Sequence, residues 1–490
     1  MDRREFIKKT GTFLWQTSIY SALIASGKLM VASPEAFADP TDPRAILLRG
    51  IRGPVLLPTD PRYAKSATIF SIRHEDIRPT VIALCENEAD IVYCLKWAKT
   101  YSVPFRVKSG GHSYEAYSSV AGLVIDLSLM NTITLDTNAN TATIGAGAKL
   151  GQIYQAVAEK NYAFVGGSCP FVGVGGLALG GGFGMLSRKF GLTIDNLIGL
   201  RMIAADGTLL NISENENSDL FWACRGGGGG NFGIATQFQF NIHPLINVAL
   251  FKVTWNPAQA AEAFLNWQNW CETLPNEVTT HFTLSGSGNG ITESHMSGQF
   301  VGTAAEMNTL LAPLLAAMPS TVEKAWDVSW INSVKYFAGG DTGAPELFKA
   351  KSSYVDRAWT ESDLAQIIQN ITKPGSEATA LLFDHYGGAI ADIASDATAF
   401  PHRAGMKFCI QYYTSWSRAN ETVARTAALA AFFDSMKPYV SDSSYSNYMD
   451  ADLKDWATAY YGSNLARLTQ IKAQIDPNRV FDFAQAIPKA

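Results

Sequence analysis

Three glycine clusters constrain the fold of this chain more than any other feature of its sequence. They lie at residues 107–114, 166–184 and 225–234, and the third contains five successive glycines, Gly226 to Gly230. The second cluster is too dense in glycine to be a helix, and ordering glycine costs more conformational entropy than ordering any other residue. That cost indicates that a bound group compensates for it. Because backbone without side chains can approach a flat ligand closely, the clusters predict a ligand site.

The segments around the clusters predict two lobes. A chain of 490 residues is longer than one hydrophobic core usually grows. Up to residue 245, short strands rich in Val, Ile and Thr alternate with helices, which predicts an α+β lobe. Residues 246–444 predict an antiparallel sheet flanked by helices, and a segment at 445–490 follows. The expected strands are 65–72, 80–85, 103–108, 122–127, 132–136, 141–145, 248–254, 279–284, 295–301, 379–385 and 407–416, and the expected helices are 87–101, 150–160, 304–317, 360–371, 419–436 and 463–474.

Residues 1–38 resemble a twin-arginine signal peptide. Arg3 and Arg4 precede a modestly apolar stretch, and Ala36-Phe37-Ala38 fits a cleavage site. The alternative is an uncleaved membrane anchor, but polar residues leave no run of about 20 apolar residues, as a span requires. We therefore expect recognition by the twin-arginine export machinery, no stable membrane anchor, and a periplasmic or secreted mature protein.

Charge and cysteine usage exclude several other classes of function. A net charge of -5 and a pI near 5.9 provide no basic stripe for nucleic acid. Six cysteines without zinc spacing argue against a metal site, and buried free thiols are the default for five of them. Cys169 differs because it lies on a glycine-flanked loop where a thiol can react. The remaining histidines, including His281 and His402, are read as structural or surface residues.

The glycine clusters do not match a Rossmann fingerprint. No strand–GxGxxG–helix frame with a later acidic partner is visible. The first cluster directly follows an expected strand, so it can turn several N–H groups toward a pyrophosphate. His112 stands near the end of this cluster, where it could reach the same ligand or simply serve as a turn residue.

The motifs SGGHSY at 109–114 and GGSCPFVGVGG at 166–176 resemble those of the berberine-bridge-enzyme-like oxidases, in the vanillyl-alcohol-oxidase flavoprotein superfamily. In that family the histidine bonds the flavin 8α-methyl carbon and the cysteine bonds C6. The resemblance implies that His112 and Cys169 carry FAD on two covalent bonds, which would raise its reduction potential and retain it. It also implies a PCMH-type FAD-binding domain at 39–245, a substrate domain at 246–444 and a berberine-bridge-like segment at 445–490 that returns to the FAD lobe.

The same resemblance implies further cofactor contacts. They are Arg106, Lys108, Ser109, Gly110, Gly111, Ser113, Tyr114, Gly167, Ser168, Val172, Gly173, Gly176, Gly180, Gly182, Gly230, Asn231, Gly233, Ile234, Asn447 and Tyr448. Val172 matches a position where valine is typical of oxygen-reactive members and bulkier aliphatic residues are typical of dehydrogenases. It therefore favours an oxidase that returns electrons to O2.

The tail motif YSNYMD at 445–450 resembles the family's YxNYxD and implies that Tyr448 is the catalytic base. A base takes the hydroxyl proton as hydride leaves for flavin N5, and a phenol can do so if its pKa is lowered from about 10. Asp384 is expected to orient this phenol, although a carboxylate would also raise its pKa. Gln411 resembles a catalytic or substrate-contacting position, and a solvated strand residue is its alternative.

The sequence therefore predicts an exported FAD oxidase of a sugar, oligosaccharide or other alcohol that releases H2O2. Its expected substrate contacts are Tyr114, Phe183 and Gln411. Phe183 departs from the tyrosine that many sugar- and alcohol-oxidising members carry in GGGYG. One alternative is a dehydrogenase that passes electrons to a quinone or another carrier. The other is a flavin-containing binding protein whose activity has decayed, for which Phe183 is the hint.

Overall fold

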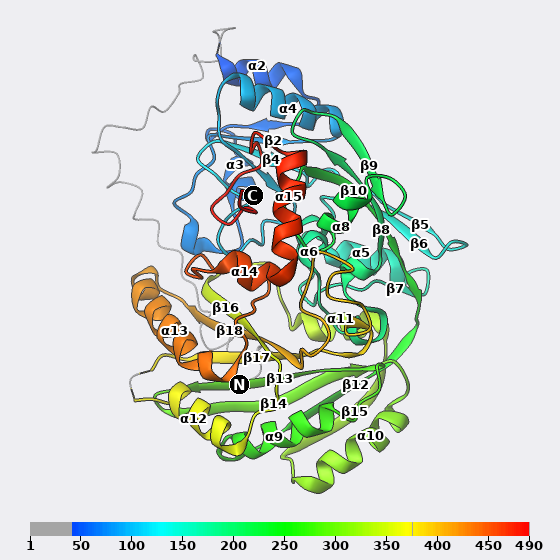
Figure 1. Ribbon diagram of the computed structural model, residues 1–490, viewed down its shortest axis with the longest axis vertical. Coiled ribbons are helices and arrows are strands. Elements are labelled where there is room, and N and C mark those ends of the chain that lie inside the picture. The colour runs from blue at the N-terminus through cyan, green and yellow to red at the C-terminus, as the bar shows by residue number, and fades with distance from the viewer. Residues whose placement is uncertain (1–41, 375, 490) are drawn as a thin grey trace.

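The computed structural model describes residues 42–374 and 376–489. Two halves are stacked along its long axis, and a seven-stranded sheet fills most of the second half (Figure 1). The signal peptide predicted at 1–38 lies outside the described residues. In the described part of the chain, no helix is both long enough and apolar enough to cross a membrane.

The first half contains a four-stranded sheet, a five-stranded antiparallel sheet and an antiparallel pair formed by its seventh and eleventh strands. The four strands have the order β1-β2-β4-β3, in which β2, β4 and β3 run parallel, and the five have the order β5-β6-β10-β8-β9. The strands are β1 (Val55–Leu56), β2 (Val81–Leu84), β3 (Phe105–Lys108), β4 (Leu123–Asp126), β5 (Ile133–Asp136), β6 (Thr141–Gly145), β7 (Tyr162–Ala163), β8 (Leu197–Ile203), β9 (Leu209–Ser213), β10 (Ile234–Asn241) and β11 (His243–Pro244). The helices are α2 (Pro43–Gly50), α3 (Tyr63–Ala67), α4 (Glu88–Thr100), α5 (Leu150–Ala158), α6 (Val174–Gly180), α7 (Ser187–Phe190) and α8 (Ser218–Cys224).

The second half is one antiparallel sheet with helices on its outer face. The strand order is β15-β12-β14-β13-β17-β18-β16. Its strands are β12 (Asn247–Thr254), β13 (Val278–Ser287), β14 (Gly290–Phe300), β15 (Val322–Ser329), β16 (Leu347–Val355), β17 (Thr379–His385) and β18 (Phe408–Trp416). The helices on its outer face are α9 (Ala260–Cys271), α10 (Ala304–Ala317), α12 (Glu361–Ile371) and α13 (Thr422–Met436), whereas α11 (Trp330–Ala338) lies on the side of the first half. Short 3-10 turns lie at Ile72–His74, Thr193–Asp195, Pro257–Gln259, Gly388–Ile390, Ala419–Glu421, Lys437–Tyr439 and Gly462–Asn464.

Alternating burial gives this sheet an inner and an outer face. Along β13, Val278, Phe282 and Leu284 are buried in the core beneath the outer helices, whereas His281 and Thr283 are only partly buried and face the first half. A strand period of two residues produces this alternation. The outer core, which includes Phe264 and Trp267 of α9, therefore supports the sheet without occupying its inner face.

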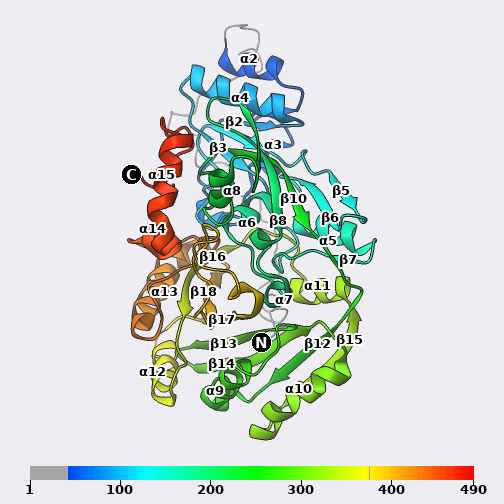
Figure 2. The same ribbon diagram turned by 45° about the vertical axis from the view of Figure 1, so that its right-hand side comes forward.

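The two halves are joined by short helices and by the end of the chain. Figure 2 shows α7 and α11 between the sheets of the two halves. From α7, the buried Arg188 donates a hydrogen bond of 2.7 Å to the Val278 carbonyl. After β18 and α13, helices α14 (Trp456–Tyr461) and α15 (Leu465–Ile475) return to the first half, where Leu468 and Ile471 enter its core. The described part of the chain thus begins, with α2, and ends in the same half.

The α+β, two-lobed PCMH-type architecture predicted from the sequence is confirmed. Two local predictions are wrong. Residues 65–72 are not a strand, because α3 and a 3-10 turn occupy this region. The second glycine cluster does contain a helix, α6, which packs Val174 and Ala178 into the core. Tertiary burial of these apolar side chains outweighs the low helix propensity of the intervening glycines.

Candidate active site

One cavity of about 980 Å³ lies between the two halves. Its wall contains residues of all three glycine clusters, the inner face of the seven-stranded sheet and the segment after α13. The predicted convergence of the clusters is therefore what the structure shows. Small-molecule sites range from about 300 to 1,000 Å³, so this cavity has room for a large ligand.

The first two clusters pack backbone against backbone at Gly110 and Gly173. A Cβ added at Gly110 would lie 2.2 Å from the Gly173 nitrogen, and one added at Gly173 would lie 2.2 Å from the Gly110 nitrogen. No side chain fits at either position without moving the main chain. Glycine is therefore required here for a close approach that brings the loop of His112 against the loop of Cys169.

Gly176 shows the opposite geometry. It borders the cavity at the exposed start of α6, and a Cβ added there would meet no atom within 4 Å. Gly229 of the third cluster borders the same space, and a Cβ there would come only within 3.7 Å of Gly176. These two glycines leave open space between the second and third clusters, where the backbone can approach a flat ligand closely.

His112 and Cys169 both border this cavity and are both partly buried. The ring of His112 stacks on Phe70 with centroids 4.4 Å apart and an angle of 15° between the planes. Burial lowers the pKa of His112 to about 4, so its imidazole is neutral at physiological pH and retains a nucleophilic nitrogen. The Cys169 thiol is free.

Two buried hydroxyls at the cavity wall have no partner among the described residues. They are the phenol oxygen of Tyr117 and Oγ of Ser118, and both residues border the cavity. Buried polar atoms are rarely left without a hydrogen bond, so these groups point to a polar ligand. Both follow the SGGHSY motif closely, yet they were not predicted from the sequence because neither residue type signals a site alone.

Most of the predicted cofactor contacts border the cavity. They are Arg106, Ser109, Gly110, Gly111, His112, Ser113, Tyr114, Gly167, Ser168, Cys169, Val172, Gly173, Gly176, Gly230, Gly233, Ile234, Asn447 and Tyr448. The structure places the other four behind the wall.

Lys108 is buried in an ion pair with Asp126 at 2.9 Å, and Asn231 accepts a hydrogen bond of 2.9 Å from the Ile487 amide. Gly182 donates its N–H to the phenol oxygen of Tyr445 at 2.7 Å. A Cβ at Gly180 would lie 2.1 Å from Asn447 Oδ1. These four residues therefore support the cavity wall through their packing and hydrogen bonds.

Tyr114, Tyr448 and Gln411 meet at one end of the cavity. The rings of Tyr114 and Tyr448 are stacked with centroids 5.7 Å apart and planes 7° from parallel. Gln411 Nε2 donates a hydrogen bond of 2.8 Å to the phenol oxygen of Tyr114. Gln411 is buried, so its alternative as a solvated strand residue is wrong. The three side chains come from the first cluster, β18 and the tail, and we call this end of the cavity the reacting end.

Asp384 also lies at the reacting end, but its hydrogen-bonded partner is a histidine. Asp384 Oδ1 is 2.7 Å from His281 Nδ1, across the paired strands β17 and β13. Burial raises the pKa of the Tyr448 phenol well above its ordinary value, and the nearby Asp384 raises it further. His281 Nε2 contacts Met185 Sδ at 2.6 Å, and both side chains border the cavity. The sequence interpretation of His281 as structural or surface thus missed a histidine at the site.

A buried ion network holds the two tyrosines in place. Lys349 Nζ lies 2.6 Å from Glu115, next to Tyr114, and 2.6 Å from Asp450, two residues after Tyr448. Burial alone would raise the pKa of Glu115, but His74, Lys349 and Arg73 outweigh burial and hold the pKa at about 2. Glu115 is therefore charged, and Lys349 of β16 joins the first half to the tail.

Phe183 occupies the cavity wall without a hydroxyl group. Its ring stacks on Tyr386 at 5.1 Å and 9°, and it contacts His281 edge to face at 5.9 Å. The Tyr386 hydroxyl lies 3.2 Å from that of Tyr354. The wall at Phe183 is thus apolar, with His281 as the polar neighbour.

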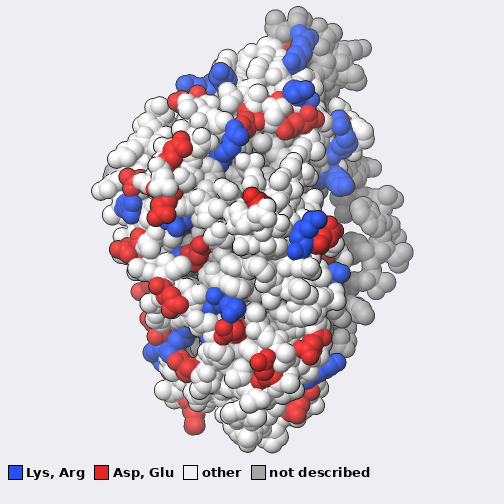
Figure 3. All heavy atoms as spheres, turned by 90° about the vertical axis from the view of Figure 1, so that its right-hand side faces the viewer, with Lys and Arg blue, Asp and Glu red and all other residues white. Residues whose placement is uncertain are grey.

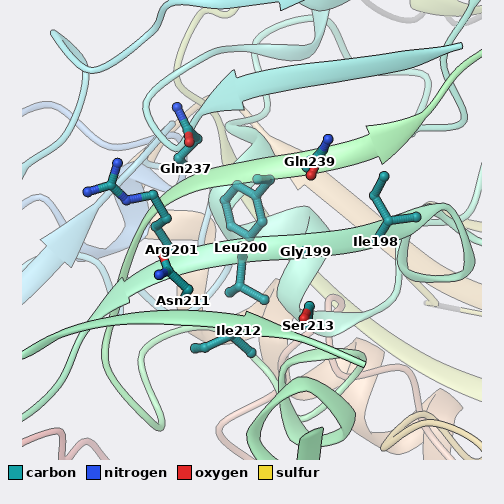
Figure 4. Close-up of a pocket in the computed structure, with 10 residues that line it drawn as sticks. Ile198, Gly199, Leu200, Arg201, Asn211, Ile212, Ser213, Gln237 and Gln239 are labelled. Atoms are coloured by element: carbon teal, nitrogen blue, oxygen red, sulfur yellow. The ribbon is translucent and has the colours of Figure 1, made fainter. Parts of the chain in front are cut away.

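A second, smaller hollow lies on the five-stranded sheet (Figure 4). Its volume is about 190 Å³, and it is lined by Ile198, Gly199, Leu200, Arg201, Asn211, Ile212, Ser213, Gln237, Phe238 and Gln239. Arg201 is its only ionisable residue and is paired with Glu88 at 2.7 Å. The hydroxyl of Ser213 is its one possible nucleophile, and the lining provides no base to activate it, so this hollow is not the better candidate for the reaction site.

Two further observations concern the charge on the surface and the grouping of metal-binding side chains. Acidic and basic side chains are interspersed on the face shown in Figure 3. Within residues 42–374 and 376–489, no three His, Cys, Asp or Glu side chains are grouped so that they could hold a metal ion.

Comparison with known proteins gives concordant matches. A family described as "FAD binding domain" matches residues 79–213, and one described as "Berberine and berberine like" matches residues 444–488. The uncharacterized FAD-linked oxidoreductase YgaK of Bacillus subtilis is 34% identical over 444 residues, 89% of this chain and 97% of the relative. The structure of wild-type BBE-like 1 of Physcomitrella patens has a TM-score of 0.85 at 30% identity and covers 92% of this chain and 100% of its own. A chitooligosaccharide oxidase has a TM-score of 0.83 at 26% identity, with coverage of 92% and 100%.

Proposed function

This chain belongs to the berberine-bridge-enzyme-like family of FAD-linked oxidoreductases, and from that premise we propose that it oxidises a hydroxyl group of a sugar, oligosaccharide or other alcohol. The observation that carries the proposal is the single cavity bordered by His112, Cys169, Tyr114 and Tyr448. Bound FAD would supply the hydride acceptor, and O2 would take the electrons to give H2O2. Similarity to a chitooligosaccharide oxidase supports the substrate class.

Covalent attachment through His112 and Cys169 is part of this proposal. The neutral imidazole and the free thiol border the same cavity, as two bonds to one ring system would require. Intact-mass analysis of the purified protein tests this directly. The wild type should carry the mass of FAD after denaturation, His112→Ala and Cys169→Ala should each keep it through the other bond, and the double variant should lose it. A wild-type chain that releases all its flavin in acid would contradict the attachment.

Two groups at the reacting end are candidates for taking the hydroxyl proton. Tyr448 is the sequence prediction, and its raised pKa keeps it protonated in the structure. The Asp384–His281 pair is the candidate that the structure adds, because a carboxylate on Nδ1 leaves Nε2 as the basic nitrogen. For the Asp384–His281 pair to accept the proton, the Met185 side chain must first move away from His281 Nε2. Tyr448 would then donate a hydrogen bond to the substrate oxygen.

The activity is tested by anaerobic bleaching of the flavin followed by admission of air. A panel of aldoses, oligosaccharides and aromatic alcohols should contain a substrate that bleaches the flavin, with rapid return of colour and release of H2O2. Slow reoxidation would instead favour a dehydrogenase that uses a quinone or another carrier. Failure of the whole panel would support the decayed binding protein.

Export is proposed from Arg3, Arg4 and the small residues before Asp39. The mass of the mature chain recovered from its host should match cleavage after Ala38. Recovery of an uncleaved chain from the cytoplasm would contradict the periplasmic or secreted location.

A further inference from the structure

The inner face of the seven-stranded sheet carries one cross-strand row of polar and charged side chains. By strand register, Asp384 pairs with His281, His281 with Ser297, Ser297 with Lys252, and Lys252 with Lys324. All five residues border the cavity. The row therefore leads from Asp384 and His281, at the reacting end, to two lysines at the far side of the sheet.

Lys252 and Lys324 lie directly opposite each other on β12 and β15. Like charges in this arrangement destabilise a sheet. No ion pair within residues 42–374 and 376–489 includes either lysine, whereas two acids of the same cavity are engaged. Asp384 is paired with His281 at 2.7 Å, and Glu293 accepts a hydrogen bond of 2.9 Å from Ser285. The repulsion between the lysines is thus not offset by a neighbouring acid in the described structure.

Protection of a sheet edge does not account for both lysines. β15 is the edge strand, and an exposed lysine such as Lys324 is a common way to prevent edge-to-edge association. Lys252 lies on an interior strand and is only partly exposed, so it does not contribute to that protection. An anionic ligand would explain why both cations face the cavity.

An aromatic surface adjoins the two lysines. Lys324 Nζ lies 4.9 Å from the ring centroid of Trp326, and Tyr336 contacts Trp326 edge to face at 5.5 Å. Trp326 and Tyr336 also border the cavity. A ligand with a flat or ring-shaped body and a negative end is therefore matched by aromatic contacts beside positive charge.

We propose that Lys252 and Lys324, beside Trp326, bind the carboxylate of a hydroxy-acid substrate whose hydroxyl group is oxidised at the reacting end. This inference rests on the proposed oxidation of a hydroxyl group. Two strand spacings, about 10 Å, separate the backbone of Lys252 from that of His281, so the substrate must be long enough to reach from the lysines to the reacting end. A uronate-terminated disaccharide and a long aromatic acid with a terminal hydroxymethyl group both have this form.

Binding to the holoenzyme, measured by titration calorimetry at low salt, tests the carboxylate site. The probes are cellobiouronic acid against cellobiose, and a biphenyl carrying hydroxymethyl and carboxylate groups at opposite ends against its carboxamide. At least one acid should bind about tenfold or more tightly than its neutral partner, as a charge-assisted contact predicts. The acid that is preferred identifies the body of the ligand. Equal affinity within both pairs, or no binding by any probe, would overturn the inference.

Variants then assign the preference to the two lysines. Lys252→Gln and Lys324→Gln should each lose most of the preference, Lys252→Arg should retain it, and half-molar salt should weaken it. Lys335→Gln is the matched control, because Lys335 is exposed in the same half and does not border the cavity. An equal loss in Lys335→Gln, or full preference in both other glutamine variants, would overturn the assignment.

Anaerobic flavin bleaching separates the two proposals. If an acid binds preferentially but does not bleach the flavin, the result supports the carboxylate site and contradicts oxidation of that compound. If cellobiose bleaches the flavin with the same KM and rate as cellobiouronic acid, the proposed oxidation of a hydroxyl group is supported and the proposed carboxylate site is contradicted.

Discussion

The ring of Tyr114 lies parallel to that of Tyr448, at 5.7 Å and 7°. One tyrosine follows the His112 loop and the other belongs to the tail, and Gln411 of β18 bonds the first of them at 2.8 Å. The reacting end is therefore assembled from three regions that are distant in sequence. Its geometry depends on the contacts that hold these regions together, and the predictions below act on those contacts.

Replacing the two candidate proton acceptors should separate their roles. If the Asp384–His281 pair takes the proton, His281→Gln and Asp384→Asn should slow anaerobic flavin reduction by about a hundredfold, the usual scale of acid–base catalysis. Tyr448→Phe should then keep the wild-type pH dependence with a smaller loss of rate. Stopped-flow reduction across pH 5 to 9, with the substrate identified from the panel, provides the measurement. The reverse pattern, with the pH dependence lost only in Tyr448→Phe, would assign the base to Tyr448.

Gly173 and Gly176 form a matched pair for the cofactor site. Gly173→Ala should disrupt the contact with Gly110, because the added Cβ would lie 2.2 Å from a backbone nitrogen. Gly176→Ala adds its methyl group to open space and replaces glycine within a helix, so the flavin-free protein should be as stable as the wild type or more stable by about 1 kcal/mol. Flavin content, from the ratio of visible to ultraviolet absorbance, should fall in both. Full flavin content in Gly176→Ala would show that this space is not the cofactor's.

Removing the central cation of the buried ion network should destabilise the protein strongly. Lys349→Met leaves the buried Glu115 and Asp450 without their shared partner, while Arg73 still pairs with Glu115 and Lys351 with Asp450. Leaving a buried charge wholly unpaired costs about 3–5 kcal/mol, and the remaining partners reduce this cost, so we expect a loss of about 2 kcal/mol or more. Urea unfolding followed by tryptophan fluorescence measures the loss, with the exposed Lys335→Met as control. A change below about 1 kcal/mol would mean that the network does not hold the tail in place.

Stability should fall as the pH is lowered from about 6.5 toward 4, partly because of His402. Burial lowers the pKa of this histidine to about 4, and its Nε2 lies 3.1 Å from the Tyr460 carbonyl. In that window the unfolded chain binds a proton that the folded chain does not, so the folded state is disfavoured. Urea unfolding at pH 7 and pH 5 should show a smaller loss in His402→Gln than in the wild type. Identical losses would exclude His402 as a source of the pH dependence.

Val172 should control the reaction with oxygen if the cofactor lies beside it. It borders the cavity between the Cys169 loop and α6. Val172→Leu adds bulk there, and we expect reoxidation by air to slow about tenfold, or about 1.4 kcal/mol in the barrier. Flavin reduction by the substrate should stay close to the wild-type rate. Reoxidation at an unchanged rate would contradict a role of Val172 in oxygen access.

The sequence predicted those parts of the site that are local in the chain. The clusters around His112 and Cys169 carry their own motifs, and both border the cavity. Asp384 and Gln411 were identified as site residues, but their partners were not. The Asp384–His281 bond depends on the register of β17 with β13, which no single segment encodes. The same reason explains why Lys349 was not identified: its partners come from the first half and the tail.

The fold shows the same division between local and distant information. The helix at 88–100 was predicted within one residue at each end because Asn87 caps it and its apolar residues have helical spacing. Residues 65–72 form no strand and residues 174–180 form the helix α6, and in both places the structure differs from what the local residues favour. Burial against residues far along the chain decided both, and that information appears only once the sheets are assembled.

The position of the tail has a consequence for how the protein matures. Asn447, Tyr448 and Phe483 complete the cavity wall, and the Ile487 amide bonds Asn231 behind the third cluster. Translation reaches these residues only after the strands of both sheets have been synthesised. A nascent chain that lacks this segment can form both sheets but cannot close the chamber around a flavin, so cofactor loading becomes a step that follows synthesis of the segment.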